Sequence, residues 1–434
     1  MKIMLIYPPI WESVGFRINC NNGMGLLYIG AVLREKGNEV RIVDAEVMGW
    51  TKDKTIEELK KWNPTHIGIS CLSNGMNSTI ELVKKIKTEL PSVWVALGGP
   101  GPSAEPDIAL SSGCDSVTIG EAELILDKSF GEKGIHMGIP PQDLDSLPLP
   151  AYDLLEPAIG SSLWGGNLPL PPLSYRPTEV VVMWSRGCIH PCTFCSKASM
   201  KRGKPRNRSP DKIVEELKIL VKKFDVNSVF VYDDELIGMN IEQNKWLHEV
   251  VKKIDKELHG KIMFKGQGRC NYNIIRDALD RELLLNMKDA GFFAMMMGCE
   301  SGSEKVKEHL KKGTSNDDIR YTLKTLHDVG IKVFGFWMIG MPEETREEAK
   351  KTEELIVEMI PYMEWIQVSV FSPLIGSDFW AEATENGWIK NFDKTKNIQI
   401  EPMLDMPWMN GNEILKWQKK FYTIFNNIKK VDNE

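Results

Sequence analysis

Residues 179–195 read EVVVMWSRGCIHPCTFC and join an apolar run to a cysteine-rich segment. The run 179–184 is rich in β-branched and apolar residues, which predicts a buried strand. Directly after it, Cys188, Cys192 and Cys195 follow the spacing C-x3-C-x2-C. Three thiolates can hold three irons of a cubane cluster and leave the fourth iron open for a reactant. The stretch therefore predicts a 4Fe–4S cluster in a loop at the carboxyl end of a strand.

A zinc site is the alternative for this loop, with His190 as the fourth ligand beside the three cysteines. Structural zinc sites prefer two separated pairs of ligands, whereas His190 lies inside the loop, so the spacing favours the cluster. The other five of the eight cysteines are scattered along the chain. This distribution is typical of metal binding in a reducing compartment rather than of a disulfide framework.

From residue 179 onward, strand-like apolar runs alternate with segments of helical period. We expect strands at 179–184, 227–232, 261–267, 293–299, 331–338 and 364–371, and helices at 210–224, 241–258, 279–290, 303–311, 316–329 and 345–360. Six strand–helix repeats predict a partial (β/α)6 TIM-like barrel, whose site lies at the carboxyl ends of the strands.

The first part of the chain also alternates strands with helices. We expect strands at 1–9, 39–46, 65–70, 93–99 and 116–120, and helices at 25–36, 55–62, 77–89 and 104–111. This order predicts an α/β domain with a doubly wound parallel sheet, which binds ligands at the carboxyl ends of its strands.

A change of composition separates the two alternating regions. The segment between them is rich in Pro and Gly and keeps no periodicity, as a linker does. We therefore expect an α/β domain (1–145), a linker (146–178), a barrel (179–385) and a helical C-terminal cap (386–434).

Overall composition narrows the class of protein. The 434 residues are 42% hydrophobic and 26% charged, and a net charge of −6 argues against a nucleic acid or an anionic membrane as partner. No apolar run reaches the roughly 18 residues that span a bilayer. The opening MKIMLIYPPI is too short for the apolar region of a signal peptide. We expect a cytoplasmic protein with neither a nucleic-acid partner nor a membrane span.

The cysteine loop resembles that of the radical S-adenosylmethionine superfamily, and further motifs of that superfamily follow in order at the predicted strand ends. They are VYDDE (231–235), GQGRCN (266–271), GCESGSE (298–304), FGFWMIGMPEET (334–345) and FSPLIGSDFW (371–380). The resemblance implies that the three cysteines bind a 4Fe–4S cluster and that Glu300 faces the amino group of S-adenosylmethionine. The cosubstrate contacts that it implies are Phe194, Asp233, Arg269, Glu300 and Ser301. A solvated acidic loop is the alternative for residues 233–235.

The first domain carries a second resemblance. Ser70 and Leu72 form S-x-L, and the pair Gly98–Gly99 follows after 25 residues, as in the S-x-L…GG pattern of cobalamin-binding domains. Physically, a serine at a strand end can bind the nucleotide tail of a corrinoid, and two glycines let that tail lie against the backbone. The alternative is two ordinary strand ends of a flavodoxin-like sheet.

The cobalamin contacts that the resemblance implies come from the ends of several strands. They are Pro8, Pro9, Gly25, Ser70, Leu72, Ser73, Asn74, Gly98, Gly99, Pro100, Gly120 and Glu121. The first strand ends in YPPIWE and lacks the D-x-H-x-x-G motif of the best-known cobalamin domains. We therefore expect base-off cobalamin without a histidine ligand, with the segment 72–76 nearest the lower face of cobalt.

Together the two domains resemble the cobalamin-dependent (class B) radical S-adenosylmethionine methyltransferases. The resemblance implies methyl transfer from methylcobalamin to an unactivated carbon through a 5′-deoxyadenosyl radical, under anaerobic conditions. It also implies a small-molecule, peptide or protein side-chain substrate and an electron donor such as flavodoxin or ferredoxin. The alternatives are a cyclase or ring-rearranging enzyme with the same cofactors and, from another class, a non-catalytic iron–sulfur and corrinoid carrier. The sequence assigns no residue to the chemical step itself.

Overall fold

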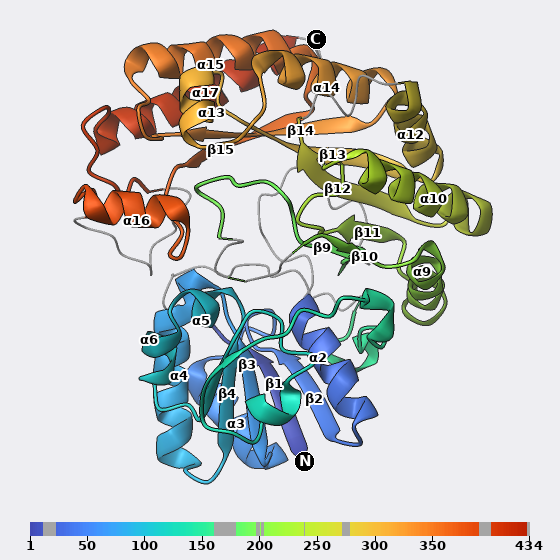
Figure 1. Ribbon diagram of the computed structural model, residues 1–434, viewed down its shortest axis with the longest axis vertical. Coiled ribbons are helices and arrows are strands. Elements are labelled where there is room, and N and C mark those ends of the chain that lie inside the picture. Colours follow the sequence, from blue (N-terminus) through green and yellow to red (C-terminus); the bar gives the residue numbers. More distant parts are fainter. Residues whose placement is uncertain are drawn as a thin grey trace.

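The computed structural model describes residues 1–11, 23–159, 179–196, 200, 204–237, 239–270, 278–389 and 401–431. Figure 1 shows two α/β units, a smaller one in blue to teal and a larger one in green to red, with the cysteine loop between them. Part of the expected linker, residues 160–178, lies outside the described residues, as do 390–400 and 432–434 of the expected cap.

The first unit is built on a seven-stranded parallel sheet in the order β6-β5-β4-β3-β1-β2-β7. Its strands are β1 (Lys2–Tyr7), β2 (Glu39–Asp44), β3 (His66–Ser70), β4 (Trp94–Gly98), β5 (Ser116–Ile119), β6 (Gly134–Met137) and β7 (Leu155–Glu156). Its helices are α2 (Met24–Glu35), α3 (Lys52–Trp62), α4 (Met76–Glu89), α5 (Pro100–Ala104), α6 (Pro106–Leu110) and α7 (Leu126–Ser129). The predicted doubly wound α/β sheet is confirmed.

Alternation along β1 explains why helices cover both faces of this sheet. Ile3 and Leu5 point into a core shared with α2, whereas Met4 and Ile6 point into a core shared with α3 and α4. A strand buried on both faces reads as a continuous apolar run, as KIMLIY does.

The two outer strands of this sheet have weak patterns of their own. β6 follows β5 in parallel register, and β7 pairs with β2 through Leu155 and Glu156. The first sheet thus takes a strand from the segment expected to be a linker. With two residues, β7 is too short to show an alternating pattern, and its pairing with β2 positions it.

The second unit is a curved sheet of six parallel strands whose order, β8-β11-β12-β13-β14-β15, follows the chain. The strands are β8 (Glu179–Val182), β11 (Ser228–Val231), β12 (Met263–Arg269), β13 (Phe292–Glu300), β14 (Lys332–Ile339) and β15 (Trp365–Val370). The helices are α9 (Pro210–Phe224), α10 (Ile241–Leu258), α12 (Ala278–Asp289), α13 (Glu304–His309), α14 (Asn316–Asp328), α15 (Arg346–Met359), α16 (Asp378–Glu385) and α17 (Gly411–Val431). Helices line the outer side of the sheet, and its concave side faces the first unit (Figure 1). The predicted partial barrel is confirmed.

Polar caps explain where the helices of the barrel begin. A side chain just before each of six helices accepts a hydrogen bond from a backbone N–H of the first turn, which satisfies a group that the helix itself leaves unpaired. The capping residues are Ser209 (α9), Asn240 (α10), Ser303 (α13), Ser315 (α14), Thr345 (α15) and Ser377 (α16). The long helix α17 then covers β15, where the hydroxyl of Tyr422 accepts from the N–H of Val368 at 2.8 Å.

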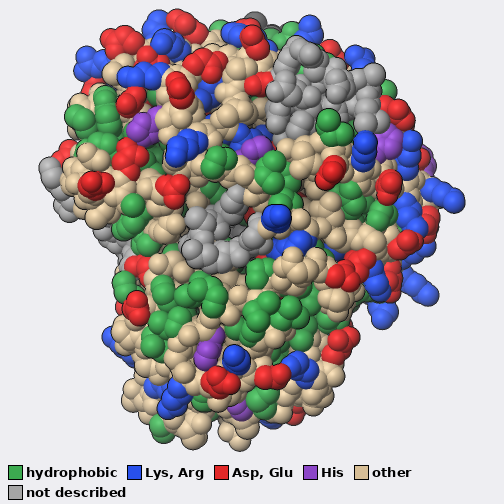
Figure 2. All heavy atoms as spheres, in the orientation of Figure 1, with side chains coloured by type: hydrophobic (Ala, Val, Ile, Leu, Met, Phe, Trp, Pro, Cys, Tyr) green, Lys and Arg blue, Asp and Glu red, His purple; other side chains and the backbone are tan. Residues whose placement is uncertain are grey.

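One hydrophobic core crosses the boundary between the units. It runs from α2 and Tyr152 into α9 and the strands of the barrel, and the rings of Tyr152 and Phe224 lie 6.3 Å apart. On the face drawn in Figure 2, acidic and basic side chains are interspersed over both units. Among the described residues, no helix combines the length and the apolar character that crossing a bilayer requires.

Candidate active site

The cysteine loop is closed at its base by a two-stranded antiparallel ladder. β9 (Ser185–Arg186) pairs with β10 (Arg206–Asn207), with Arg186 opposite Arg206. All three cysteines of the motif lie between these strands and are partly buried, and none of the cysteines in the described residues is in a disulfide. Gly187 has φ +97°, and a Cβ there would approach the carbonyl oxygen of Lys204 to 3.1 Å, so the loop needs glycine at this position.

Two aspartates after β11 hold the start of this loop. Asp233 accepts from the N–H of Trp184 at 2.8 Å and from the hydroxyl of Ser185 at 2.6 Å, and Asp234 accepts from the N–H of Gly187 at 2.7 Å. Burial raises the pKa of Asp233 to about 7. Because Asp233 is fully buried, the solvated-loop alternative does not describe it. The structure gives its carboxylate a supporting role, and its contact with S-adenosylmethionine stays a prediction.

Glu235, the next acidic residue, points toward the cysteines. Its Oε2 lies 3.4 Å from Cys188 Sγ and 3.1 Å from His190 Nε2. The zinc alternative joined His190 to all three cysteines, whereas the structure groups it with Cys188 and Glu235, within 4.8 Å of one another. One sulfur, one nitrogen and one oxygen could also bind a single cation, so this corner of the loop is suited to metal chemistry.

A cationic group completes the surroundings of the cysteines. Arg269, at the end of β12, lies with its Nη1 3.3 Å from Cys192 Sγ. Its Nε and the Oε1 of Glu235 are buried and form an ion pair at 3.9 Å, too far apart for a hydrogen bond, and neither atom has another hydrogen-bond partner among the described residues. A three-thiolate iron–sulfur cluster carries negative charge, which Arg269 would balance, and buried unsatisfied polar atoms indicate a missing ligand. The residues present therefore fit the predicted cluster and its cosubstrate.

Glu300 occupies a strained position at the end of β13. It has φ +61°, and the register of β13 against β14 shifts beside it. Its Oε1 pairs with Lys312 Nζ at 2.6 Å, and both side chains are buried. A Cβ on Gly298 would lie 2.7 Å from this oxygen and 2.9 Å from the ammonium, so glycine makes room for the pair. Burial alone would lower the pKa of Lys312, but the charge of Glu300 outweighs it and raises that pKa.

Lys312 is a site residue that the sequence analysis missed. It follows the short helix α13 in the phrase LKKGTS, where a pair of lysines suggests only a solvated surface. The one available signal was the glycine after it, which ends the turn at φ +67°.

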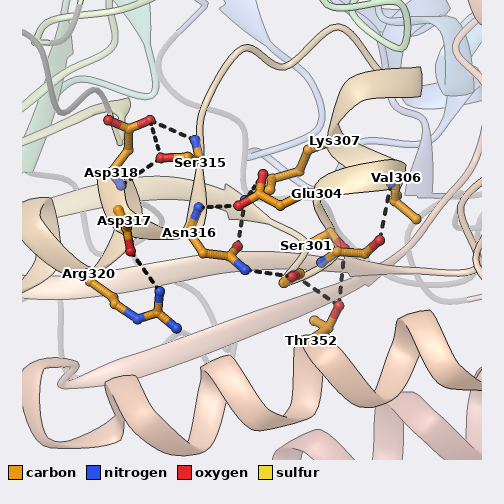
Figure 3. Close-up of polar contacts among 12 residues, drawn as sticks. Ser301, Glu304, Val306, Lys307, Ser315, Asn316, Asp317, Asp318, Arg320 and Thr352 are labelled. Atoms are coloured by element: carbon orange, nitrogen blue, oxygen red, sulfur yellow. Dashed lines mark hydrogen bonds and ion pairs between the residues drawn. The ribbon is translucent and has the colours of Figure 1, made fainter.

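Ser301 and Phe194 lie beside the site but are engaged elsewhere. The Ser301 hydroxyl is fully buried, 3.1 Å from the hydroxyl of Thr352, and it accepts from the N–H of Ser303 (Figure 3). Phe194 packs against the C-terminal apolar cluster that includes Leu310 and Phe379. Their contacts with S-adenosylmethionine stay predictions.

The predicted cobalamin residues gather at the carboxyl edge of the first sheet. Pro8 and Pro9 follow β1, the segment 70–74 ends β3, Gly98–Pro100 ends β4, and Gly120 and Glu121 follow β5. Ser70, Leu72, Ser73 and Asn74 are thus brought together with Gly98, Gly99 and Pro100, because β3 and β4 are neighbours. Gly25 lies in the first turn of α2, with open space where a Cβ would stand.

The strand ends around Gly99 pack closely and leave the amide oxygen of Asn74 without a hydrogen bond from the described residues. Gly99 has φ +94°, and a Cβ there would lie 2.7 Å from Ser70 Oγ and 2.9 Å from the carbonyl oxygen of Cys71. The buried amide oxygen of Asn74 has no hydrogen-bond partner among the described residues. Glycine at this position lets the ends of β3 and β4 approach each other, and the unsatisfied oxygen of Asn74 is what a bound ligand would complete.

Glu121 binds two arginines of the cysteine loop, and its contact with the corrinoid stays a prediction. Its carboxylate binds Arg186 at 2.8 Å and Arg206 at 2.5 Å, the two residues that face each other at the base of the cysteine loop. Burial alone would raise the pKa of Glu121, but the hydrogen bond and charge of Arg206, with those of Arg186, outweigh it and lower that pKa. The carboxyl edge of the first sheet therefore adjoins the cysteine loop.

Comparison with known families agrees with this division of sites. Residues 182–356 match the family described as the radical SAM superfamily, and residues 19–128 match the B12 binding domain.

Similar proteins span nearly the whole chain. An uncharacterised methyltransferase of Pyrococcus horikoshii is 28% identical over 98% of this chain and 92% of its own length. The cytidylyl-2-hydroxyethylphosphonate methyltransferase of Streptomyces wedmorensis is 24% identical over 98% and 90%. The anaerobic magnesium-protoporphyrin IX monomethyl ester cyclase of Rubrivivax gelatinosus is 22% identical over 96% and 75%.

Two solved structures share the fold. The methyltransferase TsrM of Kitasatospora setae, with cobalamin and a [4Fe-4S] cluster bound, matches with a TM-score of 0.67 and 15% identity over 91% of this chain and 76% of its own. The cobalamin-dependent radical enzyme OxsB matches with a TM-score of 0.66 and 17% identity over 89% of this chain. The chain spans only 55% of the length of OxsB.

Proposed function

Since the chain is a cobalamin-dependent radical S-adenosylmethionine enzyme, we propose that it transfers a methyl group from methylcobalamin to an unactivated carbon of its substrate. The observation that carries the proposal is the contact of Glu121 with Arg186 and Arg206. It sets the strand ends predicted to bind the corrinoid against the loop predicted to bind the cluster. A methyl donor and a radical generator can then act on one substrate between them.

Cys188, Cys192 and Cys195 would hold the cluster, and the strand ends around Ser70 and Gly99 would hold the corrinoid. When bound, the cluster supplies the electron that cleaves S-adenosylmethionine, and the corrinoid supplies the methyl group.

The residues around the loop orient these groups and keep water away. Asp233 and Asp234 fix the backbone at the start of the loop. Arg269 balances charge at Cys192, and Glu300 offers a buried carboxylate to the amino group of S-adenosylmethionine. Fixed charges in a buried site need no reorganisation when the reactant arrives.

We also propose that cobalamin binds base-off. In the first unit, His66 begins β3 at its amino end and His136 lies on the edge strand β6. Neither stands at the carboxyl ends of β1, β3 and β4, where Asn74 lies in the segment 72–76 expected to face the lower side of cobalt. Replacing Asn74 with His is expected to change the cobalamin absorbance spectrum, and an unchanged spectrum with unchanged activity would count against this placement.

The proposed division of the chain keeps residues 1–145 for the corrinoid and 179–385 for the cluster. The linker 146–178 and the cap 386–434 complete it. We further propose a cytoplasmic enzyme that receives electrons from a flavodoxin or ferredoxin and acts on a small molecule or on a peptide or protein side chain.

Ring closure without methyl transfer is the second candidate, because cyclases of magnesium-protoporphyrin ester are among the similar proteins. The mass of the product separates the two reactions. Anaerobically reconstituted enzyme is given S-adenosylmethionine with a deuterated methyl group, a reductant and a screen of metabolites and peptides. Methyl transfer predicts one labelled methyl group in the product together with 5′-deoxyadenosine, whereas an unchanged carbon count would favour ring closure.

A variant of the cysteine loop tests the assignment of the cluster. Cys192→Ala is expected to abolish 5′-deoxyadenosine formation, because only two of the three iron ligands remain. Cys114→Ala, at a buried cysteine of the first unit, is the matched control and should retain it. Formation of 5′-deoxyadenosine by Cys192→Ala at the wild-type rate would overturn the assignment.

A further inference from the structure

Four buried charged side chains join the two units at the base of the cysteine loop. They are Glu121 and Glu123 from the segment after β5, Arg186 from β9 and Arg206 from β10, and we call them the Glu121 network. Glu121 uses both carboxylate oxygens: Oε2 accepts from Arg186 at 2.8 Å, and Oε1 accepts from Arg206 at 2.5 Å. Glu123 accepts from Arg186 at 2.7 Å.

Burial makes these contacts energetically important. The side chains of the network are 5–7% exposed, and the guanidinium of Arg186 also lies 4.6 Å above the ring of Tyr28. Arg206 has a further partner in the carbonyl oxygen of Pro141, at 2.6 Å. Removing one member of such a group leaves a buried charge without its partner, which is far more costly than losing a surface ion pair.

The network holds both ends of the loop at once. Arg186 and Arg206 face each other across the β9–β10 ladder, and Cys188 is only two residues beyond Arg186. A single carboxylate that binds both arginines therefore fixes the entrance and the exit of the loop to the same point on the first unit.

The same point is tied to the predicted corrinoid site. The N–H of Gly120 donates to the hydroxyl of Ser103 at 2.9 Å. Ser103 belongs to α5, the short helix that begins directly after Gly99. On its other side, the backbone of Glu121 packs so closely on Gly138 that a Cβ there would lie 2.2 Å from its carbonyl oxygen. The carboxylate thus projects from a segment that has little freedom to move.

From this geometry we infer that Glu121 is a positioning residue that sets the separation between the iron–sulfur cluster and the corrinoid. It acts through the two arginines at the base of the cysteine loop, which bind both of its carboxylate oxygens. The inference rests on the two cofactors assigned to these domains and is independent of the reaction that they carry out. Fixed separation matters because displacement of about 1 Å between reacting groups can cost 10²-fold in rate.

The separation can be measured without turnover. In holoenzyme reconstituted with iron, sulfide and hydroxocobalamin, and then reduced without S-adenosylmethionine, the reduced cluster and cob(II)alamin each carry an unpaired electron. Pulsed electron paramagnetic resonance gives the distribution of distances between them. We expect one narrow distribution for the wild type and a distribution at least twofold wider for Glu121→Gln, which keeps the shape but loses the charge.

Glu216→Gln is the matched control. Glu216 is also buried at the boundary between the units, where it binds Arg208 and accepts from the hydroxyl of Tyr152 at 2.5 Å. Arg208 lies just outside the β9–β10 ladder, where its N–H donates to the carbonyl oxygen of Trp184 at 2.9 Å, whereas Glu121 binds two residues of the ladder itself. We expect its distribution to equal that of the wild type at equal iron and cobalt content. If Glu121→Gln fails to fold, Glu121→Asp, whose shorter side chain reaches one arginine at a time, is expected to widen the distribution instead.

Each outcome of the distance measurement either supports or overturns the inference. A wild-type width for Glu121→Gln or Glu121→Asp overturns the inference, and so does equal broadening in Glu216→Gln, which would make the effect a general one of the boundary. A wild type that binds no cobalamin removes its premise and overturns it as well. A narrow wild-type distribution in an enzyme that transfers no methyl group contradicts the proposed function alone.

Discussion

At the residue scale, Glu300, which is predicted to bind the amino group of S-adenosylmethionine, is already paired with Lys312. A buried ammonium already neutralises the carboxylate, 2.6 Å away, so the amino group of S-adenosylmethionine must share or replace it. The free energy of cosubstrate binding then depends on how strongly Glu300 is paired with Lys312 before S-adenosylmethionine binds.

Replacing Lys312 with Met is therefore expected to tighten the binding of S-adenosylmethionine by roughly tenfold. The variant leaves Glu300 buried without a cation, and the incoming amino group supplies one. Equilibrium binding to the reconstituted, oxidised enzyme measures the effect. Weaker binding by the variant would show instead that Lys312 contacts the cosubstrate directly.

Lys307 supplies the control for this experiment. It is also buried, but its ammonium binds Asn316 at 2.6 Å and Glu304 at 3.3 Å, within the polar group between α13 and α14 (Figure 3). Lys307→Met is expected to lower the free energy of unfolding and to leave the affinity for S-adenosylmethionine unchanged.

Gly99 allows a second prediction at this scale. Ala at this position would combine a positive φ with a Cβ 2.7 Å from Ser70 Oγ, whereas Gly113 has a similar φ of +91° and open space around it. Both substitutions cost about 1–3 kcal/mol of backbone strain. Only Gly99→Ala is expected to weaken cobalamin binding, by more than tenfold in an absorbance titration. Equal binding by the two variants would remove Gly99 from the corrinoid site.

At the element scale, the turn between β14 and α15 is held by one buried carboxylate. Glu344 Oε2 accepts from the N–H of Gly340 at 2.6 Å and of Met341 at 3.1 Å. Its other oxygen has no partner among the described residues, and burial raises its pKa to about 8 from 4.5. The folded protein therefore keeps a proton that the unfolded chain releases between these pH values.

This difference predicts a pH dependence of stability. Protonated Glu344 contributes to the free energy of unfolding. This contribution is complete below pH 4.5 and is lost as the pH rises through about 8, so the free energy of unfolding falls over this range. Glu344→Gln removes the titrating group and is expected to gain stability relative to the wild type as the pH rises. Urea unfolding at several pH values measures it, with the partly exposed neighbour in Glu343→Gln as control. A constant difference between wild type and Glu344→Gln would contradict the assignment.

The sequence predicted elements with a long, repeated pattern and missed those without one. All six barrel strands and their helices were expected within a few residues of their observed bounds, because apolar period and capping residues agree there. The ladder of β9 and β10 has only two residues on each strand, which is too short to show an alternating pattern in the sequence.

The candidate site was predictable to the extent that it lies at strand ends. Arg269 and Glu300 are where the order of motifs placed them. The corrinoid contact of Glu121 stays a prediction, whereas its observed partners, Arg186 and Arg206, are 65 and 85 residues away along the chain. A contact between distant segments leaves no trace in the local sequence, and the same holds for Lys312.

At the scale of the whole molecule, the two units share one apolar core and two groups of buried charges. Tyr152→Phe removes the hydrogen bond to Glu216 and is expected to lower the free energy of unfolding by about 1.5–3 kcal/mol, the range for a bond to a charged group. Because the boundary is common to both units, release of cobalamin and loss of cluster absorbance should shift together in denaturant. A shift in only one of these signals would show that the units unfold independently.

The charged boundary also limits how such a protein can diversify by exchanging parts. Each unit neutralises buried charges of the other. Without its partner, the second unit would leave the positive charges of Arg186 and Arg206 unpaired, and the first unit would leave the negative charges of Glu121 and Glu123 unpaired. A barrel fused to the first unit of a relative would fold stably only if that unit carries two carboxylates at the positions of Glu121 and Glu123. Recombination between relatives should therefore be tolerated within either half and be selected against at the boundary between the two units.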